Sequence, residues 1–206
     1  MNIVVYGASG NAGSRILSEL TSRGHEVTAV GRNPEKVQSV KSVRDDLSSA
    51  DRIAEIATGA DAVVSAYAPP QNDTDQLLGV TERLIEGVRK ARVKRLIVVG
   101  GAGSLEVAPG VSLLASGHLP EAWVAIATSH AKALELLKAS DINWTYFSPA
   151  AFFEAGERTG KFRVGGTALI ADEKGNSRIS FEDYAVALVD ELERPEYERS
   201  QMTIGY

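Results

Sequence analysis

A glycine-rich turn, Gly7-Ala8-Ser9-Gly10-Asn11-Ala12-Gly13, lies close to the N-terminus of the chain. It follows an apolar run, Ile3-Val4-Val5-Tyr6, that is typical of a buried strand, and it precedes an amphipathic segment that begins near Ser14. A strand, a glycine turn and a helix in this order direct backbone N–H groups and the positive end of a helix dipole toward a pyrophosphate. The glycines follow the spacing Gly-x-x-Gly-x-x-Gly, and their position after a strand is the context that such a motif requires. The sequence therefore predicts a dinucleotide site here.

The overall composition excludes several other classes of protein. The 206 residues are 44% hydrophobic and 24% charged, which is typical of one soluble globular domain. A net charge of −5 disfavours a nucleic-acid partner, because phosphate contacts need clustered Lys and Arg. The chain has no cysteine and three histidines, so we expect no disulfide and no structural metal site. Without a signal peptide or a long apolar run, we expect a cytoplasmic protein that does not associate with membranes.

Strand-like and helix-like segments alternate over the first two thirds of the chain. This alternation predicts parallel βαβ units and an α/β, doubly wound, parallel-sheet Rossmann fold. The expected strands are 2–6, 27–30, a short one around Val43, 62–65, 95–99 and 143–147, and the expected helices are 11–23, 34 to near Gln38, 50–57, 73–90 and 120–139.

The alternation stops after Pro149. Residues 149–180 contain several glycines and two strand-like runs, 162–164 and 168–170, which suggest a hairpin. We expect this segment to be a small excursion that forms a wall or lid of the substrate site. A helix over 181–193 and a strand over 201–204 should complete a single domain, 1–206.

The end of the second predicted strand indicates which nucleotide is bound. In this fold an acidic residue at that point holds the ribose hydroxyls of NAD. Here the residues are Gly31-Arg32-Asn33, and a guanidinium suits the 2′-phosphate of NADP. We therefore expect NADP(H) to be preferred over NAD(H), although Arg32 could also be a solvated surface charge.

Several motifs together resemble those of the atypical short-chain dehydrogenases/reductases. They are the glycine turn, Gly31-Arg32-Asn33-Pro34, the loop Val98-Val99-Gly100-Gly101-Ala102-Gly103, and Tyr146-Phe147-Ser148-Pro149. Within that group the chain is similar to NAD(P)H-binding flavin reductase and biliverdin reductase B-like proteins, and to related NmrA-like regulators. The predicted cofactor contacts are Gly7, Ala8, Ser9, Gly10, Asn11, Ala12, Gly13, Arg32, Asn33, Asp46, Leu47, Ser65, Ala66, Tyr67, Gly100, Gly101, Ser148, Pro149 and Ala150.

The proton-transfer pair of the standard short-chain dehydrogenases is missing. None of the six tyrosines is followed by a lysine four residues later, so alcohol or ketone chemistry is disfavoured. On the 120–139 helix His130 is a candidate proton donor or substrate contact, or else a core histidine bonded to Ser104 or a backbone carbonyl. Ser104 is a second catalytic candidate, or it caps the next turn.

A flavin or quinone does not require a strong protein acid, because it is a delocalised hydride acceptor that can take its proton from water. Phe152 and Phe153 could form the floor for such a planar acceptor, or they could belong to the core. The leading hypothesis is an NAD(P)H-dependent reductase of flavin or quinone-like acceptors, with flavin as a substrate. The alternative is an NADP(H)-binding, redox-sensing regulator without turnover. The sequence leaves the oligomeric state, monomer or dimer, open.

Overall fold

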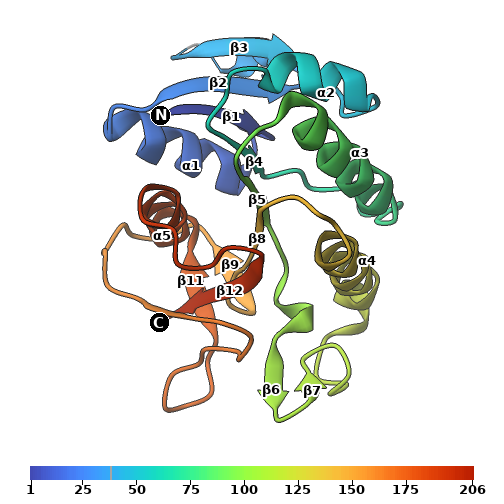
Figure 1. Cartoon of the computed structure of the whole chain (residues 1–206). Coiled ribbons are helices and arrows are strands. Elements are labelled where there is room, and N and C mark those ends of the chain that lie inside the picture. The colour runs from blue at the N-terminus through green and yellow to red at the C-terminus, as the bar shows by residue number, and fades with distance from the viewer. Residues whose placement is uncertain (38) are drawn as a thin grey trace.

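The computed structural model describes residues 1–37 and 39–206. In this described part the main sheet has eight strands in the order β10-β12-β8-β5-β4-β1-β2-β3 (Figure 1). Its strands are β1 (Asn2–Tyr6), β2 (Glu26–Gly31), β3 (Lys41–Arg44), β4 (Ala62–Ser65), β5 (Leu96–Val99), β8 (Trp144–Ser148), β10 (Arg163–Gly165) and β12 (Ser200–Gly205). The helices are α1 (Asn11–Ser22), α2 (Ala50–Ala57), α3 (Gln76–Ala91), α4 (Glu121–Lys138) and α5 (Phe181–Glu193), with 3₁₀ turns η1 (Pro34–Lys36) and η2 (Ala102–Ser104).

The sheet is parallel except for β10, and this confirms the predicted Rossmann fold. β1 pairs with β2 on one side and with β4 on the other. The strand order therefore reverses between β1 and β4, and a ligand crevice forms at such a point, outside the carboxyl ends of the strands.

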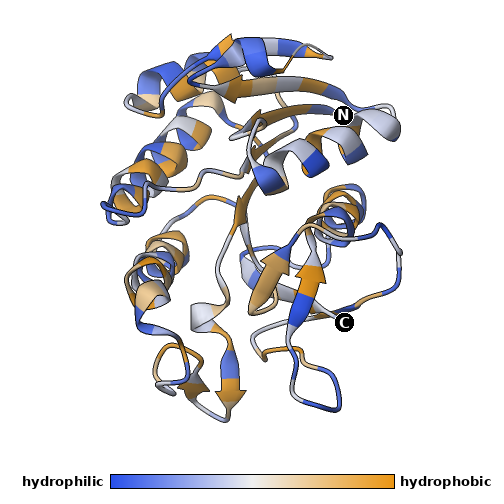
Figure 2. Cartoon of the chain, turned by 180° about the vertical axis from the view of Figure 1, so that it is seen from behind, coloured by the Kyte–Doolittle hydropathy of each residue, from blue (hydrophilic) through white to orange (hydrophobic). Residues whose placement is uncertain are grey.

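Helices cover both faces of the sheet. α1 and α5 pack against each other on one face, whereas α2, α3 and α4 pack in sequence on the other (Figure 1). A hydrophobic core lies on each face of the sheet, and the side chains of β1 alternate between the two. Ile3 and Val5 pack in the core under α1 and α5, and Val4 and Tyr6 pack in the core on the other face. Figure 2 accordingly shows hydrophobic residues along the central strands and mixed helices, as expected when both sheet faces are buried.

The segment after β8 differs from the prediction. The run at 162–164 does not form a hairpin with 168–170, because β10 pairs antiparallel with the distant strand β12. Residues 168–170 form no strand, and Ala168 makes only an isolated bridge to Glu106. Instead, β9 (Phe152–Glu154) pairs in parallel with β11 (Arg178–Ser180). A short hairpin of β6 (Glu106–Ala108) and β7 (Val111–Ser112) lies between β5 and α4, where the sequence pattern predicted no element.

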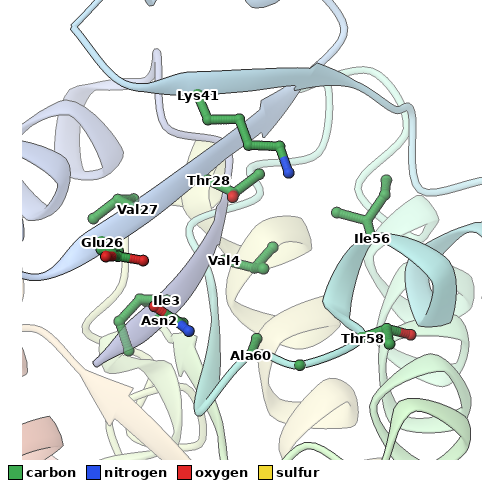
Figure 3. A pocket seen from close by; sticks show the side chains of 11 residues that line it. Asn2, Ile3, Val4, Glu26, Val27, Thr28, Lys41, Ile56, Thr58 and Ala60 are labelled. Atoms are coloured by element: carbon green, nitrogen blue, oxygen red, sulfur yellow. The ribbon is translucent and has the colours of Figure 1, made fainter.

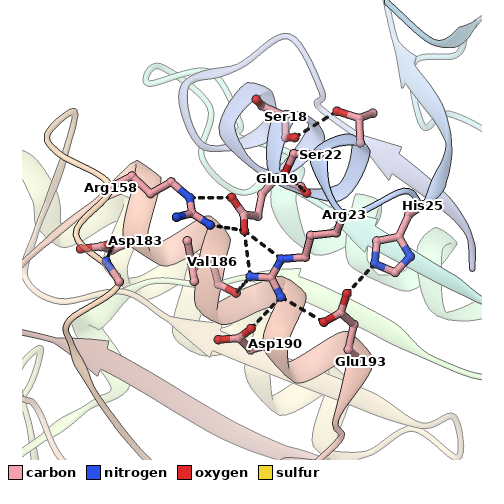
Figure 4. Close-up of polar contacts among 12 residues, drawn as sticks. Ser18, Glu19, Ser22, Arg23, His25, Arg158, Asp183, Val186, Asp190 and Glu193 are labelled. Atoms are coloured by element: carbon pink, nitrogen blue, oxygen red, sulfur yellow. Dashed lines mark hydrogen bonds and ion pairs between the residues drawn. The ribbon is translucent and has the colours of Figure 1, made fainter.

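Loop 155–162 of the excursion is fixed to α1 by a buried carboxylate (Figure 4). Glu19 on α1 is 6% exposed, and it accepts two hydrogen bonds from Arg158 at 2.8 and 2.9 Å and one from Arg23 at 2.8 Å. Arg23 also bonds Asp190 and Glu193 of α5. The helix that begins at the glycine turn is thus linked directly to the excursion and to α5.

The other element boundaries agree with the sequence pattern to within about three residues. The predicted end of the short 34–38 helix at Gln38 lies outside the described residues. Among the helices that the structure describes, none is both long and apolar enough to cross a bilayer.

Candidate functional site

The glycine turn is packed so closely that side chains are excluded from two of its positions. Gly7 has φ = 75°, and a Cβ there would lie 2.4 Å from the carbonyl oxygen of Ala66 at the end of β4. A Cβ on Gly13 would lie 2.1 Å from the carbonyl oxygen of Gly7. These contacts hold the start of α1 against the turn, and the absence of a side chain at Gly7 and Gly13 is what permits this close approach of backbone to backbone.

The N-terminus of α1 is prepared for an anion. Gly10 is the N-cap, no side chain caps the helix, and its first turn contains no acidic residue. The first helical hydrogen bond runs from the Ser14 N–H to the Gly10 carbonyl, so the N–H groups of Asn11, Ala12 and Gly13 have no partner within the helix. Free N–H groups at the positive end of a helix dipole fit a pyrophosphate.

Arg32 and Asn33 follow β2 next to this turn. A narrow groove joins Ser9 of the turn to Gly31 and Asn33. Arg32 is exposed, and within the described ranges its guanidinium has no carboxylate partner. Burial raises the pKa of Tyr67, whereas the charges of Arg32 and Arg83 act to lower it, which indicates that both guanidinium groups lie near this phenol. Arg83, which the sequence did not single out, therefore adds positive charge on this side of the crevice.

Asp46 and Leu47, two of the predicted cofactor contacts, differ in what they present to a ligand. Leu47 is 4% exposed in a left-handed conformation, φ = 62°, with its N–H donating to buried Asp45 and its carbonyl accepting from Arg83. Its side chain therefore belongs to the core and does not face a ligand. Asp46 is exposed and accepts the Ser48 N–H at 3.0 Å.

The remaining predicted cofactor residues lie at the ends of β4, β5 and β8. Ser65 is the last residue of β4. The residues that come directly after β4 and β5 at the crevice are Ala66, Tyr67, Gly100 and Gly101.

Ser148, Pro149 and Ala150 are buried, and the Ser148 hydroxyl accepts a hydrogen bond from Gln201 at 2.9 Å. These three residues therefore offer backbone to the crevice and no free side chain.

An apolar pocket of about 190 Å³ lies beside the crevice, at the end of β5 and under the N-terminal half of α4. Its lining residues are Gly101, Ala102, Gly103, Leu113, Leu119, Trp123, Ile126, Ala127, His130 and Ala151. Trp123, which is 43% exposed, meets the ring of Phe152 edge to face at 6.2 Å between centroids. Phe152, 54% exposed, thus lies next to this pocket, and the pair offers aromatic surface to a planar ligand.

His130 lines the pocket, but its surroundings do not suit the predicted proton donor. Burial lowers its pKa to about 4, so the imidazole is neutral near pH 7. Its Nδ1 lies 3.2 Å from the Tyr146 hydroxyl. The alternative interpretation, a core histidine bonded to Ser104, is not what the structure shows, because His130 contacts Tyr146 and Ser104 bonds Gln201.

The other two candidates lie away from the pocket. The Ser104 hydroxyl accepts a hydrogen bond from Gln201 at 2.9 Å, and Ser104 is not among the pocket's lining residues. Phe153 packs on Phe181 and Tyr184, with centroids 4.5 and 4.7 Å apart, so it belongs to the core rather than to the floor of a substrate site. Neighbouring positions on a strand point to opposite faces, which explains why Phe152 and Phe153 differ.

A larger pocket of about 300 Å³ lies at the other end of the strands, where β1, β2 and β3 begin (Figure 3). It is lined by the first residues of β1, β2 and β3 and by Thr58, Gly59 and Ala60 before β4. None of the predicted site residues lines it. The amino ends of parallel strands are also not where this fold binds nucleotides.

Comparisons with known proteins agree with this geometry. The sequence model of the NAD(P)H-binding family matches residues 7–195. The uncharacterized protein YwnB of Bacillus subtilis is 40% identical over 208 aligned positions, which cover 99% of this chain and 98% of YwnB.

Two solved structures also match over the whole chain. A Bacteroides thetaiotaomicron protein described as a "putative epimerase" has 45% identity and a TM-score of 0.93, with 100% of this chain and 96% of that one covered. A Streptococcus pneumoniae protein described as a "putative NADH-flavin reductase" has 35% identity and a TM-score of 0.92, with 100% and 99% covered. From its glycine turn to its last helix, this chain belongs to the NAD(P)H-binding family of Rossmann-fold proteins.

Proposed function

We propose that this protein is a reductase that uses NADPH in preference to NADH to reduce a planar, delocalised acceptor of the flavin or quinone type. The observation that carries the proposal is the position of the apolar pocket. The pocket shares Gly101 with the end of β5, and so it opens beside the crevice into which the glycine turn directs its N–H groups. An acceptor in the pocket would therefore lie next to the nicotinamide end of a bound dinucleotide.

The chain's own residues supply binding and orientation. The N–H groups at the start of α1 would hold the pyrophosphate, and Arg32 would pair with the 2′-phosphate of the adenosine. Bound NADPH supplies the hydride. Trp123 and Phe152 hold the acceptor ring, and Leu113, Leu119 and Ile126 exclude water from one side of it.

Among the residues that the structure describes, no carboxylic acid, lysine or tyrosine lines the apolar pocket, and this limits the reaction class. No Tyr-x-x-x-Lys pair is present, and His130 is neutral near pH 7. A ketone needs a proton donor at its oxygen as the hydride arrives, whereas a flavin or quinone can take its proton from water. The same absence argues against an epimerase, the name that one relative carries, because that chemistry uses a tyrosine base of this kind.

A panel of acceptors tests the proposal. Purified protein should oxidise NADPH in the presence of riboflavin, FMN or menadione well above the rate without acceptor, and NADH should be a poorer donor. Trp123→Ala should raise the KM for the acceptor and leave NADPH binding unchanged, with Val124→Ala, an exposed neighbour on the same helix turn, as the control. Tight NADPH binding without reduction of any acceptor would instead support a redox-sensing regulator, which the missing proton-transfer pair also allows.

A further inference from the structure

The hydroxyl of Tyr146 lies at the centre of a small buried network behind the pocket. Tyr146 on β8 is fully buried, and its oxygen accepts the Gly101 N–H at 3.0 Å. The same oxygen lies 3.2 Å from Nδ1 of His130 and 3.1 Å from the His130 backbone carbonyl oxygen. Burial raises the pKa of this phenol, so it keeps its one proton.

This single proton can lie in one of two places, and the distances favour one of them. Two oxygens 3.1 Å apart need a proton between them, so the phenol donates to the His130 carbonyl. The 3.2 Å contact with the ring then needs a proton on Nδ1, which donates to the phenol oxygen. With the Gly101 N–H, the oxygen donates once and accepts twice, and every group in the network is satisfied. If the phenol donated to Nδ1 instead, the two oxygens would face each other without a proton.

The other ring nitrogen of His130 faces the pocket. Nε2 has no hydrogen-bond partner among the described residues, yet it is not one of the buried side-chain atoms left without a partner. It therefore retains access to solvent, and the open space beside His130 is the 190 Å³ pocket. With the proton on Nδ1, the Nε2 atom presents a lone pair.

We infer that Tyr146 is a positioning residue that holds His130 as the Nδ1–H tautomer, so that Nε2 is a hydrogen-bond acceptor in the pocket. The pocket then favours a planar acceptor that brings its own N–H or O–H donor, such as the imide of an isoalloxazine ring. A simple quinone brings only carbonyl oxygens, which meet the lone pair of Nε2 unfavourably. This choice between acceptors rests on the proposed function, whereas the tautomer does not.

Nuclear magnetic resonance tests the tautomer without any turnover. Long-range ¹H–¹⁵N correlation on the folded protein at pH 7 should show His130 with a protonated Nδ1 and a bare Nε2. The chain has three histidines, and His130→Asn identifies the signal. Tyr146→Phe should give a substantial Nε2–H population. Tyr184→Phe, which removes a buried hydroxyl bonded to the Phe147 carbonyl, should leave the tautomer unchanged. A protonated Nε2 in the unmodified protein would overturn the inference, and so would a Tyr146→Phe protein that keeps the original tautomer.

Lumiflavin and its N3-methyl derivative test the selection of acceptors. The methyl group removes the imide donor, so we expect about a tenfold higher KM, the loss of roughly one hydrogen bond. In His130→Leu the two KM values should agree within twofold. Equal KM values in the unmodified protein would overturn the selection of donors. If neither flavin is reduced, the proposed function and this selection both fail, whereas the correlation spectra still decide the tautomer.

Discussion

Replacing Gly13 by alanine should abolish tight binding of NADPH, because the added methyl group collides with the backbone. An ideal Cβ at Gly13 lies 2.1 Å from the Gly7 carbonyl oxygen and 2.8 Å from the Gly7 carbonyl carbon. Ordinary contacts begin at 3.4 Å, so the start of α1 and the turn must separate by about 1 Å. Neither atom belongs to a flexible side chain that could move aside.

The separation displaces the N–H groups that we propose bind the pyrophosphate. A charge-assisted hydrogen bond is worth about 1.5–3 kcal/mol, and a displacement of about 1 Å removes most of one or two such bonds. We therefore expect the Kd for NADPH to rise by roughly 30-fold to several hundred-fold. Isothermal titration calorimetry measures this change directly.

Gly166→Ala is the matched control. Gly166 follows β10, at the edge of the sheet away from β1 and the glycine turn, where a Cβ meets no atom within 4 Å and φ is not in the left-handed region. This variant should bind NADPH within threefold of the unmodified protein. If Gly13→Ala is folded, as judged by a cooperative thermal transition, and still binds NADPH within threefold, the assignment of the pyrophosphate to this turn is refuted.

Three further results are expected. Arg32→Ala should weaken NADPH binding about tenfold or more and leave NADH nearly unchanged, and equal losses in calorimetry would show that this guanidinium does not contact the 2′-phosphate. His130 has a pKa of about 4 in the folded protein and 6.5 when exposed, so the unfolded chain gains the proton first as the pH falls. The free energy of unfolding should therefore decrease by up to about 3 kcal/mol between pH 6.5 and pH 4. Urea unfolding of His130→Asn should lack this part of the pH dependence. Glu19→Gln should lower the free energy of unfolding by about 2 kcal/mol at pH 7 in the same assay. Hydrogen bonds from Arg158 and then Arg23 lower the pKa of this carboxyl, so the charged form stabilises the fold at pH values above the pKa of the unfolded state. A decrease no larger than that of Glu26→Gln, at an exposed position, would contradict this.

The parts of the site that could be predicted from sequence are those that depend on neighbouring residues. The turn from Gly7 to Gly13 is a local structure, and Arg32 follows its strand directly, so spacing alone located both. The alternating pattern located the strands of the parallel sheet and their helices for the same reason.

The remaining parts depend on contacts between distant segments. The run at 162–164 pairs with β12, about forty residues later, and no local pattern distinguishes that partner from 168–170. The sequence shows Tyr146 only as part of a motif at the end of a buried strand, and its contact with His130 appears only when α4 packs across β8. Phe152 lies beside the pocket and Phe153 packs on the core, and this difference depends on which face of the short strand β9 meets the core. Because side chains alternate along a strand, the sequence indicates that the two phenylalanines point to opposite faces. No neighbouring residue indicates which of the two faces the core.

The carboxylate of Glu19 on α1 accepts hydrogen bonds from Arg158 in loop 155–162 and from Arg23. These bonds link α1 to the loop, and they limit which parts of the protein can be replaced independently. A designer who wished to change the acceptor by transplanting residues 149–180 from a relative would also replace Arg158, and Glu19 would keep only its bond to Arg23. The helix that we propose binds the nucleotide would then carry a buried carboxylate with only part of its compensating charge. We expect such a chimera to be stable only if the residue at position 19 is replaced together with the loop. The two segments therefore have to be exchanged as one unit, although they lie far apart in the chain.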